Sequence, residues 1–303
     1  MSVDRQFVVA GIGIWITFIA VQLGGLLLAR PLIAEDVDMG ADPADPRIGV
    51  FFVVALLLAT AMLLAAFRFG LHGIVRGFIY LVAIGITWWV LSVLLPSAIV
   101  VAGINPMPPI LAVVLGLAVA YHPAWWLIDL QAVILGVGVV SLFGVSLGIL
   151  PIVVLLVLLA VYDAISVYGT KHMLTLAEDA VSTRLPVLFV VPLAGERNSG
   201  ESADPEGAGA LYIGLGDAAI PGMLIVSSAV HLPLDTWTIA GMAFNPATAG
   251  AIVGLTAGLG VLLGMIRAGR AHAGLPVLNS GVILGFLIGA FIAGLGPIEA
   301  LGL

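Results

Sequence analysis

Nine long apolar runs dominate the 303-residue sequence and constrain its fold more than any other feature. A helix that crosses the hydrocarbon core of a bilayer needs roughly 20 mostly apolar residues. The composition agrees with a membrane location, because 62% of the residues are hydrophobic and only 9% are charged. The sequence therefore predicts an all-α membrane protein with nine transmembrane helices. The runs lie near residues 7–29, 49–67, 74–95, 107–121, 126–144, 149–168, 211–230, 247–266 and 276–296.

One hydrophilic segment, 169–210, interrupts this pattern. Residues 195–209 within it are rich in Gly, Ser, Asp and Glu, a composition typical of a flexible loop. The segment therefore divides the chain into two helical parts. We expect an N-terminal six-helix part, 1–168, and a C-terminal three-helix part, 211–303.

The orientation in the membrane is predicted from the basic residues, which are retained on the cytoplasmic side of spanning helices. Nine crossings place eight basic residues on the side of the N-terminus and of loop 169–210, and two, Arg30 and Arg47, on the other side. Without Arg184 and Arg197, which lie deep in the long loop, the ratio is still six to two. We expect a cytoplasmic N-terminus and loop, and an external C-terminus. The eight residues are Arg5, Arg68, Arg76, Lys171, Arg184, Arg197, Arg267 and Arg270.

The residues that are absent or scattered exclude several functions. There are no cysteines, so disulfides and thiolate chemistry are excluded, and the five histidines have no short metal-ligand spacing. We therefore predict no metal and no cofactor. The net charge of −7 comes mostly from loop carboxylates and argues against a nucleic-acid partner. The sequence leaves the oligomeric state open, including a homo-oligomer.

Two aspartates, Asp163 and Asp217, lie inside apolar runs. A charged side chain at the bilayer centre costs about 2.5–3.5 kcal/mol, so intramembrane carboxylates usually face the protein interior and serve a function. Asp163 precedes the end of its run by five residues and Asp217 follows the start of the next by about six. At 1.5 Å per residue, both lie roughly 8–10 Å inside the cytoplasmic boundary. Carboxylates at one depth on adjacent antiparallel helices can meet.

Such a pair supports acid–base chemistry. Like charges a few ångströms apart cannot both ionise, so the two groups share one proton. The ionised carboxylate can take a proton from water, and the protonated one can donate to a scissile carbonyl oxygen. The resulting gem-diol collapses with the roles reversed. This pattern requires neither a metal nor a covalent nucleophile.

Two glycines precede Asp217 in the sequence Gly214-Leu215-Gly216-Asp217. Glycine allows another backbone to approach closely, which suits a site that must admit a peptide. Gly-x-Gly also occurs elsewhere in the chain, for example at 11–13, 136–138, 258–260 and 294–296, and carries no weight alone. An aspartate directly after it within a spanning run is much rarer. For Asp163 the structural alternative is a buried carboxylate bonded to a neighbour such as Ser166.

Three motifs together resemble the presenilin and signal peptide peptidase family. Tyr162-Asp163, Gly214-Leu215-Gly216-Asp217 and Pro276-Val277-Leu278 correspond in order to that family's Tyr-Asp, Gly-x-Gly-Asp and Pro-Ala-Leu, and the match covers the whole chain. The compact chain is similar to archaeal homologues. Val277 departs from the pattern, since the family has alanine there, and it adds bulk beside the expected active site.

The resemblance implies a presenilin-like nine-helix fold and an intramembrane aspartic endopeptidase. It implies cleavage of peptide bonds within transmembrane helices of membrane-protein or signal-peptide substrates, with Asp163 and Asp217 as the catalytic pair. Other motif residues are implied to support the site or bind substrate. These are Tyr162, Gly214, Leu215, Gly216, Pro276, Val277 and Leu278.

Simpler roles exist for several of these residues. Proline favours the first turn of any helix, which would explain Pro276, and tyrosine collects at membrane interfaces, which would explain Tyr162. Asp129, near the start of the fifth run, is interpreted as an end-of-helix residue rather than a third catalytic carboxylate. Pro221, four residues after Asp217, removes a helical hydrogen bond and is a candidate hinge.

Two other functions compete with proteolysis. A proton- or cation-coupled transporter would also use intramembrane carboxylates, but transporters commonly show internal repeats with interrupted helices. No such repeat is evident here, and the division is six helices plus three. A non-catalytic assembly subunit would leave the matched depth of the two aspartates without a purpose.

Overall fold

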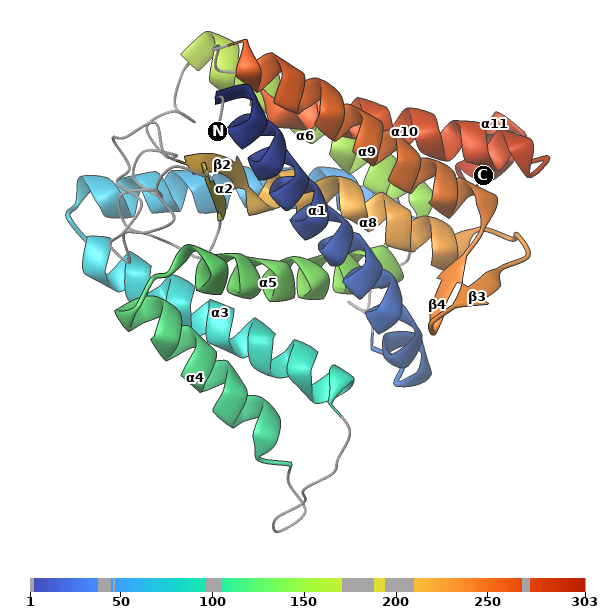
Figure 1. The fold of residues 1–303 in the computed structure, drawn as a ribbon. Helices are drawn as coiled ribbons and strands as arrows, with labels where there is room; N and C mark the ends of the chain where they lie inside the picture. The colour runs from blue at the N-terminus through green and yellow to red at the C-terminus, as the bar shows by residue number, and fades with distance from the viewer. Residues whose placement is uncertain are drawn as a thin grey trace.

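The structure is a computed structural model that describes residues 3–37, 45, 47–95, 105–170, 188–193, 210–268 and 273–302. Most of these residues are helical (Figure 1). The N-terminal helices are α1 (Val3–Ala34), α2 (Arg47–Arg68), α3 (His72–Leu94), α4 (Met107–Tyr121), α5 (Trp125–Ser146) and α6 (Ile149–Ile165), which continues as the π-helical turn η1 (Ser166–Thr170). The C-terminal helices are α8 (Leu215–His231), α9 (Pro246–Arg267), α10 (Gly274–Ile292) and the short α11 (Pro297–Ala300).

Seven helices in the described part of the chain are long and apolar enough to cross a membrane. Two more, α4 and α8, are apolar but shorter. Each of these nine helices corresponds to one of the predicted apolar runs. The prediction of a helical, multi-pass membrane protein is confirmed.

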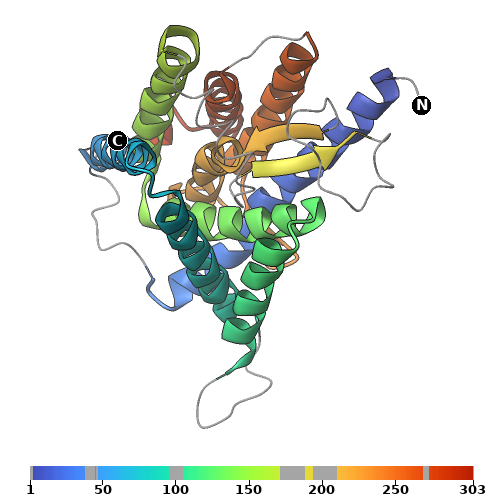
Figure 2. The ribbon, with the colours of Figure 1, turned by 90° about the vertical axis from the view of Figure 1, so that its left-hand side faces the viewer.

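The prediction of an all-α chain needs one correction, because four short strands form two separate hairpins within the residues that the structure describes. β1 (Leu188–Pro192) pairs antiparallel with β2 (Ala210–Gly214), with Leu188 opposite Gly214 (Figure 2). β3 (Trp237–Ile239) pairs with β4 (Met242–Phe244) across a turn with positive φ at Ala240 and Gly241. A run of five residues is too short to distinguish strand from helix by periodicity. The sequence therefore placed β1 in a loop and β2 in a helix.

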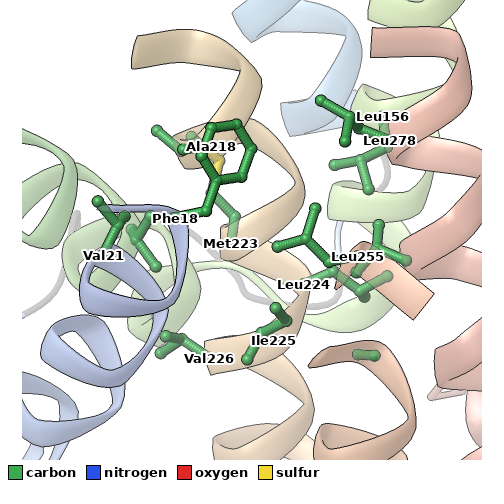
Figure 3. Packing of buried hydrophobic residues seen from close by; sticks show 14 of the residues in the cluster. Phe18, Val21, Leu156, Ala218, Met223, Leu224, Ile225, Val226, Leu255 and Leu278 are labelled. Atoms are coloured by element: carbon green, nitrogen blue, oxygen red, sulfur yellow. The ribbon is translucent and has the colours of Figure 1, made fainter. Parts of the chain in front are cut away.

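The helix α8 lies at the centre of the molecule and is surrounded by α1, α5, α6, α9 and α10. Figure 3 shows its buried side chains between Phe18 and Val21 of α1 on one side and Leu156, Leu255 and Leu278 on the other. Eleven of its 17 residues are buried. By contrast, none of the most apolar window of α2 is buried, and this helix lies at the periphery. The core therefore forms around the helix that carries Asp217.

The helices α9 and α10 approach each other backbone to backbone. Both carry glycines four residues apart on the facing sides, an arrangement that allows close packing of membrane helices. A Cβ added at Gly281 would lie 2.5 Å from the carbonyl oxygen of Gly254, and one at Gly258 would lie 3.1 Å from that of Val277. This contact fixes the position of the first turns of α10. The facing glycines are Gly250, Gly254 and Gly258 of α9, and Gly281, Gly285 and Gly289 of α10.

Candidate active site

Asp163 lies in the last turn of α6, and its side chain is buried at 5% exposure. Its Oδ2 accepts a hydrogen bond of 3.1 Å from the backbone N–H of Leu275 in α10. The backbone of Gly274 also interacts with this carboxylate. The partners of Asp163 therefore include the first turn of a helix more than 100 residues away in sequence, beyond the local neighbour Ser166 that the sequence offered.

Asp217 lies in the first turn of α8, closer to the helix start than predicted. The predicted run began at residue 211, but residues up to Gly214 form strand β2, and the helix begins at Leu215. Gly214 is the N-cap residue, and its backbone interacts with the Asp217 carboxylate. Because backbone N–H groups and the helix dipole favour negative charge at an N-terminus, this turn suits a carboxylate. The side chain is half-buried.

The two carboxylates meet at Gly274, the first residue of α10. A Cβ added at Gly274 would lie 2.9 Å from Oδ1 and 3.2 Å from Oδ2 of Asp217. The next residue, Leu275, bonds Asp163. Asp163 and Asp217 also interact electrostatically. Two adjacent residues of α10 therefore contact both carboxylates, and the absence of a side chain at Gly274 makes room for Asp217.

The Pro276-Val277-Leu278 motif forms the first turns of α10. Pro276 is half-buried and occupies a position where a missing N–H is tolerated, while Leu278 is fully buried in the main core. The carbonyl of Val277 faces α9 at Gly258. The motif directly follows Gly274 and Leu275, the first two residues of α10, which touch the aspartates.

The remaining motif residues occupy different surroundings. Leu215 packs against α5, where a Cβ at Gly136 would lie 3.1 Å from its Cδ1, and Gly216 is exposed. Tyr162 is half-buried. Across the segments that the structure describes, Tyr162 makes no hydrogen bond to either carboxylate. These positions therefore surround the carboxylate pair without binding it directly.

The sequence did not reveal Gly274, Leu275 or the tyrosine of η1. The hydroxyl oxygen of Tyr168 accepts a hydrogen bond of 3.3 Å from the backbone N–H of Ala273, which adds a second link between the end of α6 and the start of α10. The one signal in the sequence was the position of Gly274 two residues before Pro276. With 38 glycines in the chain, that signal is weak.

Two buried amide side chains tie the helices of the aspartates to their neighbours. Asn279 Nδ2 of α10 donates 2.8 Å to the carbonyl of Leu156 in α6. Gln22 Nε2 of α1 donates 3.0 Å to the carbonyl of Ala218 in α8, next to Asp217. Hydrogen bonds in an apolar interior are strong relative to those in water, so these contacts restrict sliding of α6 and α8.

The position and partner of Asp129 differ from those predicted for an end-of-helix residue. It lies in the second turn of α5, is 7% exposed, and its Oδ1 accepts a hydrogen bond of 2.7 Å from the backbone N–H of Val190 in β1. The carboxylate therefore anchors a strand. Within the described ranges, no group of three or more His, Cys, Asp or Glu residues could hold a metal ion.

Comparison with known proteins identifies the family. The chain matches the model of "Signal-peptide peptidase, presenilin aspartyl protease" over residues 15–295. The chain belongs to this family. Two solved structures of a presenilin family intramembrane aspartate protease, in space groups C222 and P2, are each 34% identical to it. They superpose with TM-scores of 0.68 and 0.67, covering 93% of this chain and 99% and 97% of theirs. No match was found among curated proteins.

This presenilin-family member is an intramembrane aspartyl protease, as its three motifs implied. The family match covers both parts of the chain, so it includes the segments of Asp163 and Asp217. The presenilin-family fold is also confirmed, because the similarity extends over nearly the whole length of the solved structures.

Proposed function

We propose that Asp163 and Asp217 are the catalytic pair of this protease. The observation that carries the proposal is that Gly274 and Leu275 of α10 contact both carboxylates. The two groups hold one proton between them, since two negative charges beside the same turn of α10 repel in a medium of low polarity. The pair then acts on water and on a carbonyl in one step.

The proposed reaction is general acid–base hydrolysis of a peptide bond. One carboxylate removes a proton from water, whose oxygen attacks the scissile carbonyl carbon, and the other donates its proton to the carbonyl oxygen. In the gem-diol, the carboxylate that gained a proton delivers it to the leaving nitrogen. The other carboxylate takes a proton from a gem-diol hydroxyl as the C–N bond breaks, so the pair again shares one proton. No cofactor is required.

The proposed substrates are transmembrane helices of other membrane proteins or signal peptides. A helix protects its peptide bonds by internal hydrogen bonding, so the cleaved segment must unwind near Asp217. Gly214 and Gly216 leave room for such a backbone, and Gly216 is exposed. Tyr162, Leu215 and the Pro276-Val277-Leu278 turn are proposed to shape this site. Pro221 lies within α8, where its missing N–H leaves the carbonyl of Asp217 without its helical donor, and its role as a hinge stays a prediction.

The proposed topology has nine membrane crossings, with α4 and α8 as the short ones, and a cytoplasmic N-terminus. This topology places the last turn of α6 and the first turn of α8 on the cytoplasmic side. Residues 1–168 form the part that carries Asp163 and residues 211–303 the part that carries Asp217. The segment 169–210 is proposed as a cytoplasmic loop between them, in which β1 is an ordered strand. Within this segment the structure describes residues 169, 170, 188–193 and 210, and the rest of the segment lies outside the described residues.

The test is cleavage of a tagged single-span substrate by purified protein in detergent. Wild type should cleave, and Asp163→Ala and Asp217→Ala should each reduce cleavage to the uncatalysed background, because neither carboxylate can perform both proton transfers alone. Cleavage that survives either substitution refutes the pair. Ion flux in liposomes without cleavage would instead support the transporter hypothesis.

A further inference from the structure

Asp129 is a buried carboxylate that the proposed reaction does not use. It lies on α5, two helices away in sequence from Asp217, and accepts a hydrogen bond from Val190 of β1. A carboxylate within a membrane-spanning helix is costly unless a partner and a role retain it. The partner is a backbone N–H, so the role of Asp129 depends on what β1 does.

One face of β1 packs against α1. The rings of Phe189 and Phe18 lie 6.0 Å apart between centroids, and Phe189 is fully buried. A Cβ added at Gly13 of α1 would lie 2.9 Å from Cγ1 of Val191. Residues of the strand therefore pack against a helix of the central core.

The other face of β1 packs towards α4 and α5. Val190 forms a small buried cluster with Val119 of α4 and Ile128 of α5, the residue before Asp129. The strand is therefore held between two layers of helices. Figure 2 shows β1 and β2 side by side above α5.

Asp129 binds the edge of β1 that faces away from β2. Val190 is opposite Tyr212 in the ladder, and every second residue of an antiparallel pair points its N–H away from the partner strand. The N–H of Val190 points to α5, where Asp129 accepts it at 2.7 Å. This bond fixes the hairpin along the strand axis, a direction in which apolar packing alone allows sliding.

The hairpin in turn determines where α8 begins. β2 ends at Gly214, which is also the N-cap of α8, and Asp217 follows in the first turn. No loop separates the strand from the helix, so a displacement of β2 moves the start of α8. The position of β1 is thus transmitted to Asp217 through the ladder.

We propose that Asp129 is a positioning residue for Asp217, acting through the β1–β2 hairpin. The proposal rests on the proposed role of Asp217 in peptide hydrolysis. The required group is a hydrogen-bond acceptor at the position of Oδ1, and the negative charge is dispensable. Asp163 is unaffected, because its support comes from α10.

The first test compares cleavage by Asp129→Leu and Asp129→Asn. Asn keeps the acceptor oxygen, so its kcat should stay within about threefold of wild type. Leu removes it, and kcat should fall about 10²-fold with KM little changed, because small displacements of catalytic groups have effects of that order. Gln131→Leu is the matched control. This neighbouring amide of α5 is also buried and bonds Thr87 of α3, so its loss should leave kcat near wild type.

The second test measures β1 directly, using the absence of cysteines from the chain. Val191→Cys and Ser141→Cys, both at buried positions, are labelled with a maleimide in separate proteins. Asp129→Leu should accelerate labelling of the Val191→Cys protein about tenfold, as expected for loss of one buried hydrogen bond. Asp129→Asn should not. Ser141→Cys, in α5, should be labelled slowly in every background.

The outcomes separate this proposal from the proposed function. Activity in Asp163→Ala, or none in wild type, overturns the catalytic pair and with it this proposal. An active wild type with Asp129→Leu equal to it overturns the positioning role alone. Equal losses in Asp129→Leu and Asp129→Asn, or faster labelling of Ser141→Cys as well, also overturn it, because the acceptor would then not be the required group or the whole fold would have loosened.

Discussion

Asp163 and Asp217 are held in contrasting ways. Asp163 is buried in the last turn of α6, and a backbone N–H of α10 donates a hydrogen bond to it. Asp217 is half-buried in the first turn of α8, and the backbone of Gly214, three residues earlier, interacts with it. The first carboxylate thus depends on tertiary packing of α6 against α10, and the second on local geometry where a strand becomes a helix. Gly274 is the point at which the two arrangements join.

Gly274→Val should reduce cleavage more than a change that reaches only one of the aspartates, because it disturbs both carboxylates. A Cβ at this position lies 2.9 Å from Asp217 Oδ1, and its neighbour Leu275 bonds Asp163. We expect cleavage to fall at least about 10²-fold. The control is Gly264→Val in α9, where an added Cβ meets no atom within 4 Å. Equal activity of the two variants would contradict the described contact.

Gly254→Leu should weaken the support of Asp163 more than that of Asp217. An added side chain here meets the backbone of α10 at Gly281, so the two helices must separate. Overpacking of this kind destabilises by about 1–3 kcal/mol. Thermal unfolding in detergent measures the loss. Gly260→Leu, on the same helix with open space at its Cβ, should unfold near the wild-type temperature, and a matching loss there would exclude the α9–α10 contact as the cause.

Leu275→Pro should affect Asp163 alone. Proline is tolerated in the first turn of a helix, and it removes the N–H that donates to Asp163 at 3.1 Å. A hydrogen bond to a charged group contributes about 1.5–3 kcal/mol, so we expect kcat to fall about tenfold or more. Leu275→Ala keeps the N–H and serves as the control. If both variants lose activity equally, the Leu275 side chain matters rather than its amide.

Tyr168→Phe should have the smallest effect. It removes the hydroxyl that accepts from Ala273 at 3.3 Å, a long hydrogen bond made by an exposed side chain. We expect cleavage within about threefold of wild type, since one such bond contributes about 1 kcal/mol or less. Steady-state cleavage rates measure this change. A loss comparable to that of Leu275→Pro would mean that η1, rather than α10, positions Asp163.

Much of the fold was predictable because long apolar runs report directly on membrane helices. Asp163 and Asp217 stood out for the same reason, since charge within such runs is rare. Their predicted shared depth assumed that a helix begins at residue 211, whereas β2 ends and α8 begins between Gly214 and Leu215. That boundary is set by pairing with β1, a contact between segments about 20 residues apart. Local pattern therefore predicted the candidate catalytic residues better than the geometry that holds them.

Two features could not be predicted, for a different reason. The missing side chain of Gly274 leaves space for Asp217, and that space has meaning only once α8 lies against it. Asp129 resembled a residue at the end of a helix until a strand from the long hydrophilic segment was found to donate to it. In both cases the role comes from a partner distant in sequence.

The length of α8 has a consequence for how water reaches the site. Its 17 residues span about 25 Å, which is shorter than the roughly 30 Å hydrocarbon core of a bilayer. A helix that is too short thins the surrounding lipid or draws its polar end inward. Here the end that is drawn inward carries Asp217 and is continued by a strand with polar backbone groups. The hydrophobic mismatch of α8 therefore brings the aqueous boundary towards Asp217, the residue proposed to act on water.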